Sequence, residues 1–362
     1  MKCVKSFASV REDAILRLPR DVSPGLPINL SNKFMAVIGD IISAVVVDKR
    51  FEHQQNNLLL PLVREALELS RFSFADSFPE LKFVDVVTGT SFRLNRIRHL
   101  EKIMDDIIRQ HHVKKAGGVG DVEEDLVHVL LRIKDHGDLS LHSIKAVIQD
   151  IFVGGIETSS TTLEWAMSEL MRTPETMKRA QEEVREAMRG KGKVEERDAG
   201  GLSYLKLVIK ETLRLHTPAL LLIPRLGRET SQVLGFNIPA GSRVFVNAWA
   251  MGRDPTYWGD DAERFRPERF QGSPVDFKRA NFEYIPFGAG RRMCPGMQFA
   301  LAGVELVLAH LLFYFDWELP HGTQPGDLDM TQNMGATASR KSELFLLAAP
   351  RIPLPDVDIS WY

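Results

Sequence analysis

The chain has 362 residues, of which 44% are apolar and 26% charged, values typical of a soluble globular protein. Lysine and arginine number 46 and aspartate and glutamate 48, so the net charge of −2 gives no support to a nucleic-acid-binding protein. The two cysteines, Cys3 and Cys294, exclude a multi-disulfide scaffold and a four-cysteine zinc site. Because no uninterrupted apolar run reaches roughly 18 residues, we expect no membrane anchor in this chain.

The first two-thirds of the sequence predict helices. Apolar residues recur at three- and four-residue spacing over residues 58–69 and 94–111, and the pair His111-His112 is expected at a solvated helix end. Between these helices, the aromatic-rich segment 72–89 predicts an ordered connection. Segment 114–124, which is rich in glycine and charge, predicts a flexible surface loop.

A long helix is predicted from Ser140, a favourable N-cap, to Arg172, where Thr173-Pro174 ends it and starts another helix. At 1.5 Å per residue it is about 48 Å long. Its middle is unfavourable, because two glycines at 154–155 and the Ser/Thr run at 158–162 each weaken a helix by up to about 1 kcal/mol. A long helix with a weak middle indicates that another group needs room there.

The last third has a different texture. After a helix over 203–216, the sequence predicts turns at 235–241, a strand at 243–247 and proline-rich ordered coil at 254–287. A final helix is predicted over 295–315 and a closing strand over 344–348. The pattern indicates a mainly α protein with a small β region.

One cysteine follows a glycine-rich coil and precedes the last predicted helix. Free backbone N–H groups at the helix start, together with Arg291 and Arg292, favour a thiolate at Cys294. Gly290 and Gly296 let the backbone turn tightly or approach a flat ligand. A thiolate is one of the axial ligands of haem iron, and a small buried cysteine is the alternative.

Four motifs resemble those of the cytochrome P450 monooxygenases, in the family's order. Residues 287–296 fit F-x-x-G-x-R-x-C-x-G at every fixed position, and residues 154–159 fit the [A/G]-G-x-[D/E]-T-[S/T] of the long I helix. Residues 211–214 fit the E-x-x-R of the K helix, and 267–270 fit the P-E-R-F box. Residues 218–225 resemble the plant microsomal members. The resemblance covers essentially the whole chain.

The resemblance implies roles for the residues around the cysteine. Cys294 is the expected ligand of the haem iron, in a loop shaped by Phe287, Gly290 and Gly296. The expected partners of the haem propionates are Arg292 and Arg225, because a guanidinium group suits carboxylates. Solvated surface arginines are the alternative.

Further roles follow from the other motifs. Glu157 and Thr158 are expected to deliver protons at the oxygen site, with a threonine bonded to its own helix as the alternative. Glu211, Arg214 and Arg269 are expected to form a buried structural cluster, with a surface i,i+3 pair as the alternative. The residues expected to line an apolar substrate pocket are Phe152, Ile156, Ala219, Leu221 and Ala336.

The resemblance implies a haem-thiolate monooxygenase that inserts one atom of O2 into a small hydrophobic substrate in secondary metabolism, at the cytosolic face of the endoplasmic reticulum membrane. It implies haem b as cofactor and electrons from NADPH through a separate reductase, since no nucleotide-binding motif is present. A candidate docking surface for an acidic reductase is formed by Arg264, Arg266, Lys278, Arg279 and Arg291. A basic face that is only solvated is the alternative. His216 is expected to cap a helix rather than bind iron.

Residues 4–12 resemble the segment just after the family's C helix. We therefore expect one truncated domain that lacks the family's anchor and its N-terminal helices and strands. Its residues 1–217 form a helical part, and 218–362 hold the small sheet, the haem-binding loop and the last helix. Weak haem binding and little turnover are expected of such a chain.

Two other functions stay open: a catalytically inactive haem-binding fragment, and a haem-thiolate isomerase or peroxygenase that needs no reductase. The Glu157–Thr158 pair favours oxygen chemistry. Dependence of turnover on NADPH and reductase would separate the enzymes.

Overall fold

The computed structural model describes residues 25–47, 101–109, 111, 125–278, 281–320, 322–335 and 337–352. The helix predicted over 58–69, the connection over 72–89 and the loop over 114–124 lie outside this part, whereas residues 101–109 are helical as predicted. The α-helices with described bounds are α2 (Leu30–Val46), α7 (Leu126–Asp135), α8 (Leu141–Arg172), α9 (Pro174–Ala187), α10 (Glu196–Ala199), α11 (Ser203–Leu215), α12 (Ala248–Met251), α13 (Pro255–Trp258) and α14 (Met297–Tyr314).

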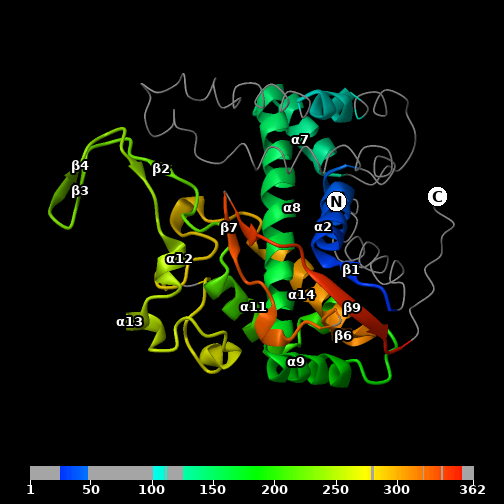
Figure 1. Ribbon diagram of the computed structural model, residues 1–362. Helices are drawn as coiled ribbons and strands as arrows, with labels where there is room; N and C mark the ends of the chain where they lie inside the picture. Colours follow the sequence, from blue (N-terminus) through cyan, green and yellow to red (C-terminus); the bar gives the residue numbers. More distant parts are fainter. Residues whose placement is uncertain are drawn as a thin grey trace, which may run out of the picture.

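Helix α8 is the central element of the fold, and Figure 1 shows it running through the molecule with α2 along one side. Its predicted start is confirmed, because the Ser140 hydroxyl accepts a hydrogen bond from the Ser143 backbone N–H at 3.0 Å. Its predicted end is confirmed too, with Pro174 opening α9 directly after the cap residue Thr173.

The close packing of α2 on α8 depends on one of the glycines in the middle of α8. A Cβ atom built at Gly155 would lie 2.6 Å from Ile42 Cδ1. Glycine therefore lets the two helices approach at this point, even though it weakens the helix by about 1 kcal/mol. The core continues from this contact through α9, α11 and α14.

Helix α14 is apolar on all sides because it is a core helix. By length and composition alone, α14 is the one helix among the described residues that could cross a membrane. However, 67% of that stretch is buried inside the protein. Burial of this kind is typical of a central helix of a globular domain.

The β-structure is small and divided. Its strands are β1 (Ile28–Asn29), β2 (Arg225–Leu226), β3 (Ser231–Val233), β4 (Phe236–Ile238), β5 (Arg243–Val244), β6 (Phe315–Glu318), β7 (Gln332–Met334), β8 (Ala338–Arg340) and β9 (Phe345–Pro350), and the short 3-10 helices are η4 (Pro267–Phe270), η5 (Gly290–Arg292) and η6 (Pro325–Asp327). One antiparallel sheet has the order β1-β9-β6, and the remaining strands form the pairs β2-β5, β3-β4 and β7-β8. The first part of the chain thus supplies a strand to the sheet of the second part.

Two predictions for the β region need correction. The strand predicted over 243–247 is shorter, and β5 spans Arg243–Val244 only. The turn-rich segment 235–241 contains strand β4, which follows a tight turn with positive φ at Leu234 and Gly235. The β3-β4 hairpin projects from the body of the molecule (Figure 1).

The prediction that His111 lies at a solvated helix end is wrong. Its side chain is 1% exposed, and its Nε2 atom lies 2.8 Å from Asp125 Oδ2. The periodicity of the helix before His111 contains no information about Asp125, which follows 14 residues later in the sequence.

Candidate functional site

The loop that carries Cys294 is held in shape by its own backbone. The Cys294 N–H donates to the Phe287 carbonyl oxygen at 2.9 Å, and the Met293 N–H donates to that of Gly290 at 3.1 Å. Gly288 and Gly290 have φ values of 71° and 73°, a region that favours glycine. The glycines of this segment are therefore needed to fold the coil back just before α14.

The side chains of the loop divide into an anchored set and an open set. Phe287 is half-buried and packs edge-on against Phe277, with ring centroids 5.2 Å apart, and Met293 also packs against the core. Cys294, in contrast, is an exposed free thiol. The alternative of a small buried cysteine is wrong, and the loop presents its sulfur outward from a fixed base.

Two arginines lie beside this loop. An Arg225 Nη atom donates to the Arg292 carbonyl oxygen at 3.3 Å. The same guanidinium lies 3.9 Å from the position that a Cβ would take at Gly288. Arg225 is half-buried and Arg292 is exposed. Strand β2 thus brings the Arg225 side chain against the cysteine loop, which carries Arg292 two residues before Cys294.

The weak middle of α8 combines an acid, an alcohol and open space. Glu157 Oε1 accepts a hydrogen bond from Thr337 Oγ1 at 3.1 Å, and Thr158 Oγ1 donates to the Gly154 carbonyl at 2.6 Å. The contact named as the alternative for Thr158 is therefore present. A hydroxyl that donates its proton still has lone pairs to accept another one. No atom lies within 4 Å of a Cβ built at Gly154.

Two of the five residues expected to line a pocket are buried in the core. Phe152 and Ile156 are 2% and 0% exposed in the hydrophobic core. Each is two residues from Gly154 in sequence, so both lie on the opposite face of α8. We correct the expectation for these two, because they pack inward rather than toward the open side.

The remaining pocket predictions fall elsewhere. Leu221 is exposed and Ala219 is half-buried, both in the segment before β2. Ala336 lies outside the described residues. On α8, the face of Gly154 carries instead the residues three and four positions away, among them the half-buried Ile151.

Glu211, Arg214 and Arg269 come together in a buried cluster. Arg214 makes two 2.8 Å bonds to the Glu211 carboxylate, from Nε to Oε2 and from an Nη atom to Oε1. Arg269 Nε donates to Glu211 Oε1 at 2.8 Å. The side chains of Glu211 and Arg214 are both 0% exposed. The alternative of a surface i,i+3 pair is therefore wrong.

The same cluster also holds the coil that leads to the cysteine loop. The Arg266 backbone N–H donates to Glu211 Oε1 at 2.8 Å, and Arg214 donates to the Ala262 carbonyl at 2.6 Å. Arg269 adds a bond to the Trp258 carbonyl at 3.1 Å. Each buried charge is thus paired and hydrogen-bonded, which is the condition for burying it at all.

His216 is a helix cap, as predicted, and is also part of a buried network. Its N–H donates to the Thr212 carbonyl at 2.7 Å, and its ring stacks on Trp165 with centroids 4.0 Å apart. Its Nε2 atom lies 2.7 Å from Glu169 Oε1. Burial lowers the pKa of His216, although the contact with Glu169 opposes that shift. The ring therefore makes two structural contacts, one with Trp165 and one with Glu169.

Sequence reasoning missed a second buried carboxyl on α8. Glu164 accepts a hydrogen bond from Ser31 of α2, and Arg340 of β8 lies near enough to lower its pKa. Burial dominates and raises the pKa of Glu164 to about 7. The spacing could have pointed to Glu164, because it follows Glu157 by two helical turns and therefore lies on the same side of α8.

Comparison with known proteins places this geometry in a family. A family model described as cytochrome P450 matches residues 4–346. The chain belongs to the cytochrome P450 family. Premnaspirodiene oxygenase of Hyoscyamus muticus is 46% identical over 97% of this chain and 72% of its own length. Melianol synthase of Ailanthus altissima is 47% identical over 97% and 69%, and desmethyl-deoxy-podophyllotoxin synthase of Sinopodophyllum hexandrum is 46% identical over 96% and 70%.

Family membership establishes the class of chemistry. This cytochrome P450 is of the plant type and is a haem-thiolate monooxygenase, an oxidoreductase with a haem-iron cofactor. Its electrons come from a nicotinamide cofactor through a reductase, and its co-substrates are O2 and a hydrophobic molecule. Plant members of the family are generally bound to membranes. The predicted mainly α fold with a small β region is confirmed.

Proposed function

We propose that Cys294 is the axial ligand of the haem iron in this P450. The observation that supports this most strongly is the exposed free thiol on a loop whose backbone is fixed by the Cys294 N–H to Phe287 carbonyl bond. The thiol lies three residues before α14, where unpaired N–H groups of the helix start favour a thiolate.

The described residues fit a haem group. The donor set consists of one thiol with two arginines beside it, which matches an iron and two carboxylates. Cβ atoms built at Gly290, Gly296 and Gly154 would meet nothing within 4 Å, so the backbone leaves room for a flat ligand. In this proposal Arg225 and Arg292 hold the propionates. When bound, haem supplies the iron centre at which O2 is reduced and one oxygen atom is transferred to the substrate.

Glu157 and Thr158 are the proposed proton-delivery residues. The Thr158 hydroxyl is oriented by its bond to Gly154, so its free lone pairs point away from that carbonyl. In this proposal the Thr158 hydroxyl gives its proton to the oxygen site. The Glu157 carboxyl, which is held by Thr337, then supplies Thr158 Oγ1 with a new proton.

The proposed substrate is a small lipophilic molecule that enters beside Leu221 and Ala219, which lie between α11 and the arginines. The name of one relative gives premnaspirodiene as its substrate, which fits this chemical class. For the electron donor we propose an NADPH-dependent reductase with an acidic docking face.

The basic surface for this reductase is made by Arg264, Lys278 and Arg291, which are all exposed. Arg266 is already paired with Asp261 at 2.9 Å, and Arg279 lies outside the described residues. As in other plant members, the proposed place of action is the cytosolic face of the endoplasmic reticulum membrane.

The test of the iron ligand is Cys294→Ala, with Cys3→Ala as the matched control. We expect the reduced carbon monoxide complex of the alanine variant at 294 to lose its thiolate-type absorption band, while the variant at position 3 keeps it. Because the Cys294 side chain is exposed, the unfolding free energy of the haem-free protein should change by less than about 0.5 kcal/mol. A thiolate-type band that persists in Cys294→Ala would show that the ligand is a different residue.

A further inference from the structure

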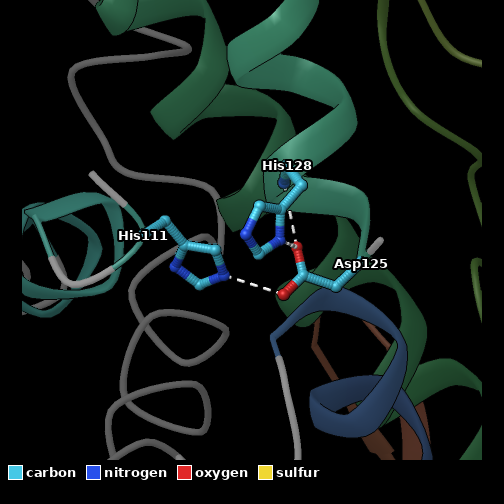
Figure 2. A group of neighbouring side chains, drawn as sticks. All are labelled: His111, Asp125 and His128. Atoms are coloured by element: carbon cyan, nitrogen blue, oxygen red, sulfur yellow. Dashed lines mark hydrogen bonds and ion pairs between the residues drawn. The ribbon is translucent and has the colours of Figure 1, made fainter. Parts of the chain in front are cut away.

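A buried group of two histidines and one aspartate lies outside the site described above. His111 lies two residues beyond the helical residues 101–109 and is itself helical, Asp125 is the N-cap of α7, and His128 lies in the first turn of α7. One ligand atom from each residue lies within 4.8 Å of the other two. Figure 2 shows both imidazole rings turned toward the same carboxylate.

Each oxygen of that carboxylate contacts a different ring. His111 Nε2 lies 2.8 Å from Asp125 Oδ2, and His128 Nδ1 lies 2.8 Å from Asp125 Oδ1. The rings meet edge to face, with centroids 4.6 Å apart. One carboxylate thus contacts both rings, each through its own oxygen atom.

The position of His111 requires a proton or a metal ion at this centre. Its other ring nitrogen, Nδ1, lies 2.7 Å from the Ile107 carbonyl oxygen and must donate its proton to it. In the neutral ring, Nε2 then carries a lone pair, which faces the lone pairs of Asp125 Oδ2. That contact is repulsive unless a proton, on the ring or on the carboxyl group, or a metal ion lies between the two atoms.

The surroundings match those of metal-binding residues. A metal-ligating histidine usually donates its other N–H to a carbonyl or carboxylate, as His111 does to Ile107. The Asp125 carboxylate is fixed in turn, because its Oδ1 accepts the His128 backbone N–H at 2.9 Å. Two imidazole nitrogens and one carboxylate oxygen are a ligand set typical of Zn²⁺.

We propose that His111, Asp125 and His128 bind a zinc ion that joins the helical residue His111 to the start of α7. Zinc bonds of about 2.0–2.1 Å place neighbouring ligand atoms about 3.3 Å apart. The two contacts of 2.8 Å then widen by about half an ångström, which small rotations of the side chains provide. His128 is half-buried, so the ion enters from the side of its ring.

Zinc titration of the full chain without a histidine tag tests the proposal. After dialysis against a chelator, we expect one equivalent of Zn²⁺ to be taken up in competition with a chromophoric chelator, and the unfolding midpoint to rise with zinc concentration. Co²⁺ in its place should give the absorption of a tetrahedral nitrogen and oxygen site. None of these measurements depends on enzyme activity or on haem.

The variants are chosen so that folding is retained. Asp125→Asn keeps an N-cap for α7 but removes the charge, and His128→Ala truncates a half-buried ring. We expect each to weaken zinc binding about tenfold or more. His136→Ala, an exposed histidine at the end of the same helix, is the control and should bind as wild type does. Absence of zinc uptake, or uptake unchanged in both cluster variants, would overturn the proposal and leave a proton as the bridging cation.

Discussion

The Glu211 cluster and the Cys294 loop differ in how much of their bonding the chain itself supplies. Both Glu211 oxygens accept hydrogen bonds, Oε2 from Arg214 and Oε1 from Arg214, Arg269 and the Arg266 backbone, and the carboxylate is fully buried. The Cys294 thiol is exposed, and the loop makes its bonds through backbone atoms instead. The charged groups that stabilise the fold are buried and paired, whereas the thiol proposed to bind a ligand is exposed on a loop fixed by its backbone.

This difference separates a structural cluster from a ligand-binding loop in the second half of the chain. The cluster fixes the coil before the loop, because it bonds to carbonyls of Ala262 and Trp258 and to the Arg266 N–H. The loop then needs few contacts of its own. The two regions should accordingly respond in opposite ways to substitution, one in stability and the other in cofactor binding.

The largest effect is expected for Glu211→Ala. Removing one partner leaves two buried guanidinium groups without their anion, which costs about 3–5 kcal/mol of unfolding free energy. Denaturant unfolding followed by circular dichroism measures the loss. The matched control is Glu186→Ala, from an exposed i,i+3 pair with Arg189, which should change stability by less than about 1 kcal/mol. Equal losses of stability in Glu211→Ala and Glu186→Ala would show that the buried cluster contributes no more than a surface ion pair.

A pH-dependent effect is expected for Glu164→Gln. The folded-state pKa of Glu164 is about 7, above its ordinary value of 4.5, so the folded protein holds the proton more tightly than the unfolded chain. Wild-type stability should therefore fall as the pH rises from about 4.5 to about 7, by roughly 3 kcal/mol from this group. The glutamine variant lacks this loss.

The measurement for Glu164 is the difference in unfolding free energy between variant and wild type across that range. It should increase with pH up to about 7 and then stay constant. Glu182→Gln, at an exposed position of α9, should give a difference that does not vary. A difference between Glu164→Gln and wild type that is independent of pH would contradict the shifted pKa.

An intermediate effect on catalysis is expected for Thr158→Ala. With the proton path interrupted, NADPH consumption should continue while peroxide is released, and product per NADPH should fall roughly tenfold or more across several lipophilic terpenoids. Thr162→Ala is a close control, because Thr162 makes the same bond to the carbonyl four residues earlier, at 2.8 Å. Thr158→Ser should restore coupling. If both alanine variants couple equally well, the Thr158 hydroxyl has only a helical role.

The smallest effect is expected for Arg292→Ala. The side chain is exposed, so a propionate contact should contribute about 1 kcal/mol, or roughly fivefold in the rate of haem loss. Transfer of haem to an excess of an apo-globin measures that rate. Arg228→Ala, another exposed arginine, should leave it unchanged. Equal rates in all three proteins would argue against Arg292 as a propionate partner.

The sequence by itself determined the family and the long central helix. Local chemistry decided the limits of α8, since Ser140 caps its start and Pro174 opens the next helix. The order of four motifs identified the P450 chain, because each motif is a set of residue types at fixed spacing. The helix cap at His216 was also predictable from its place before Thr217-Pro218.

Only the tertiary structure decided which way the helices face. Apolar residues at helical spacing suit a protein core and a lipophilic pocket equally well, and the packing of α2 against Gly155 turns Phe152 and Ile156 inward. Likewise, a histidine at the end of a helix is buried or solvated according to what the chain brings beside it. Asp125 reaches His111 from another helix, and a contact between two elements cannot be deduced from the periodicity of either one.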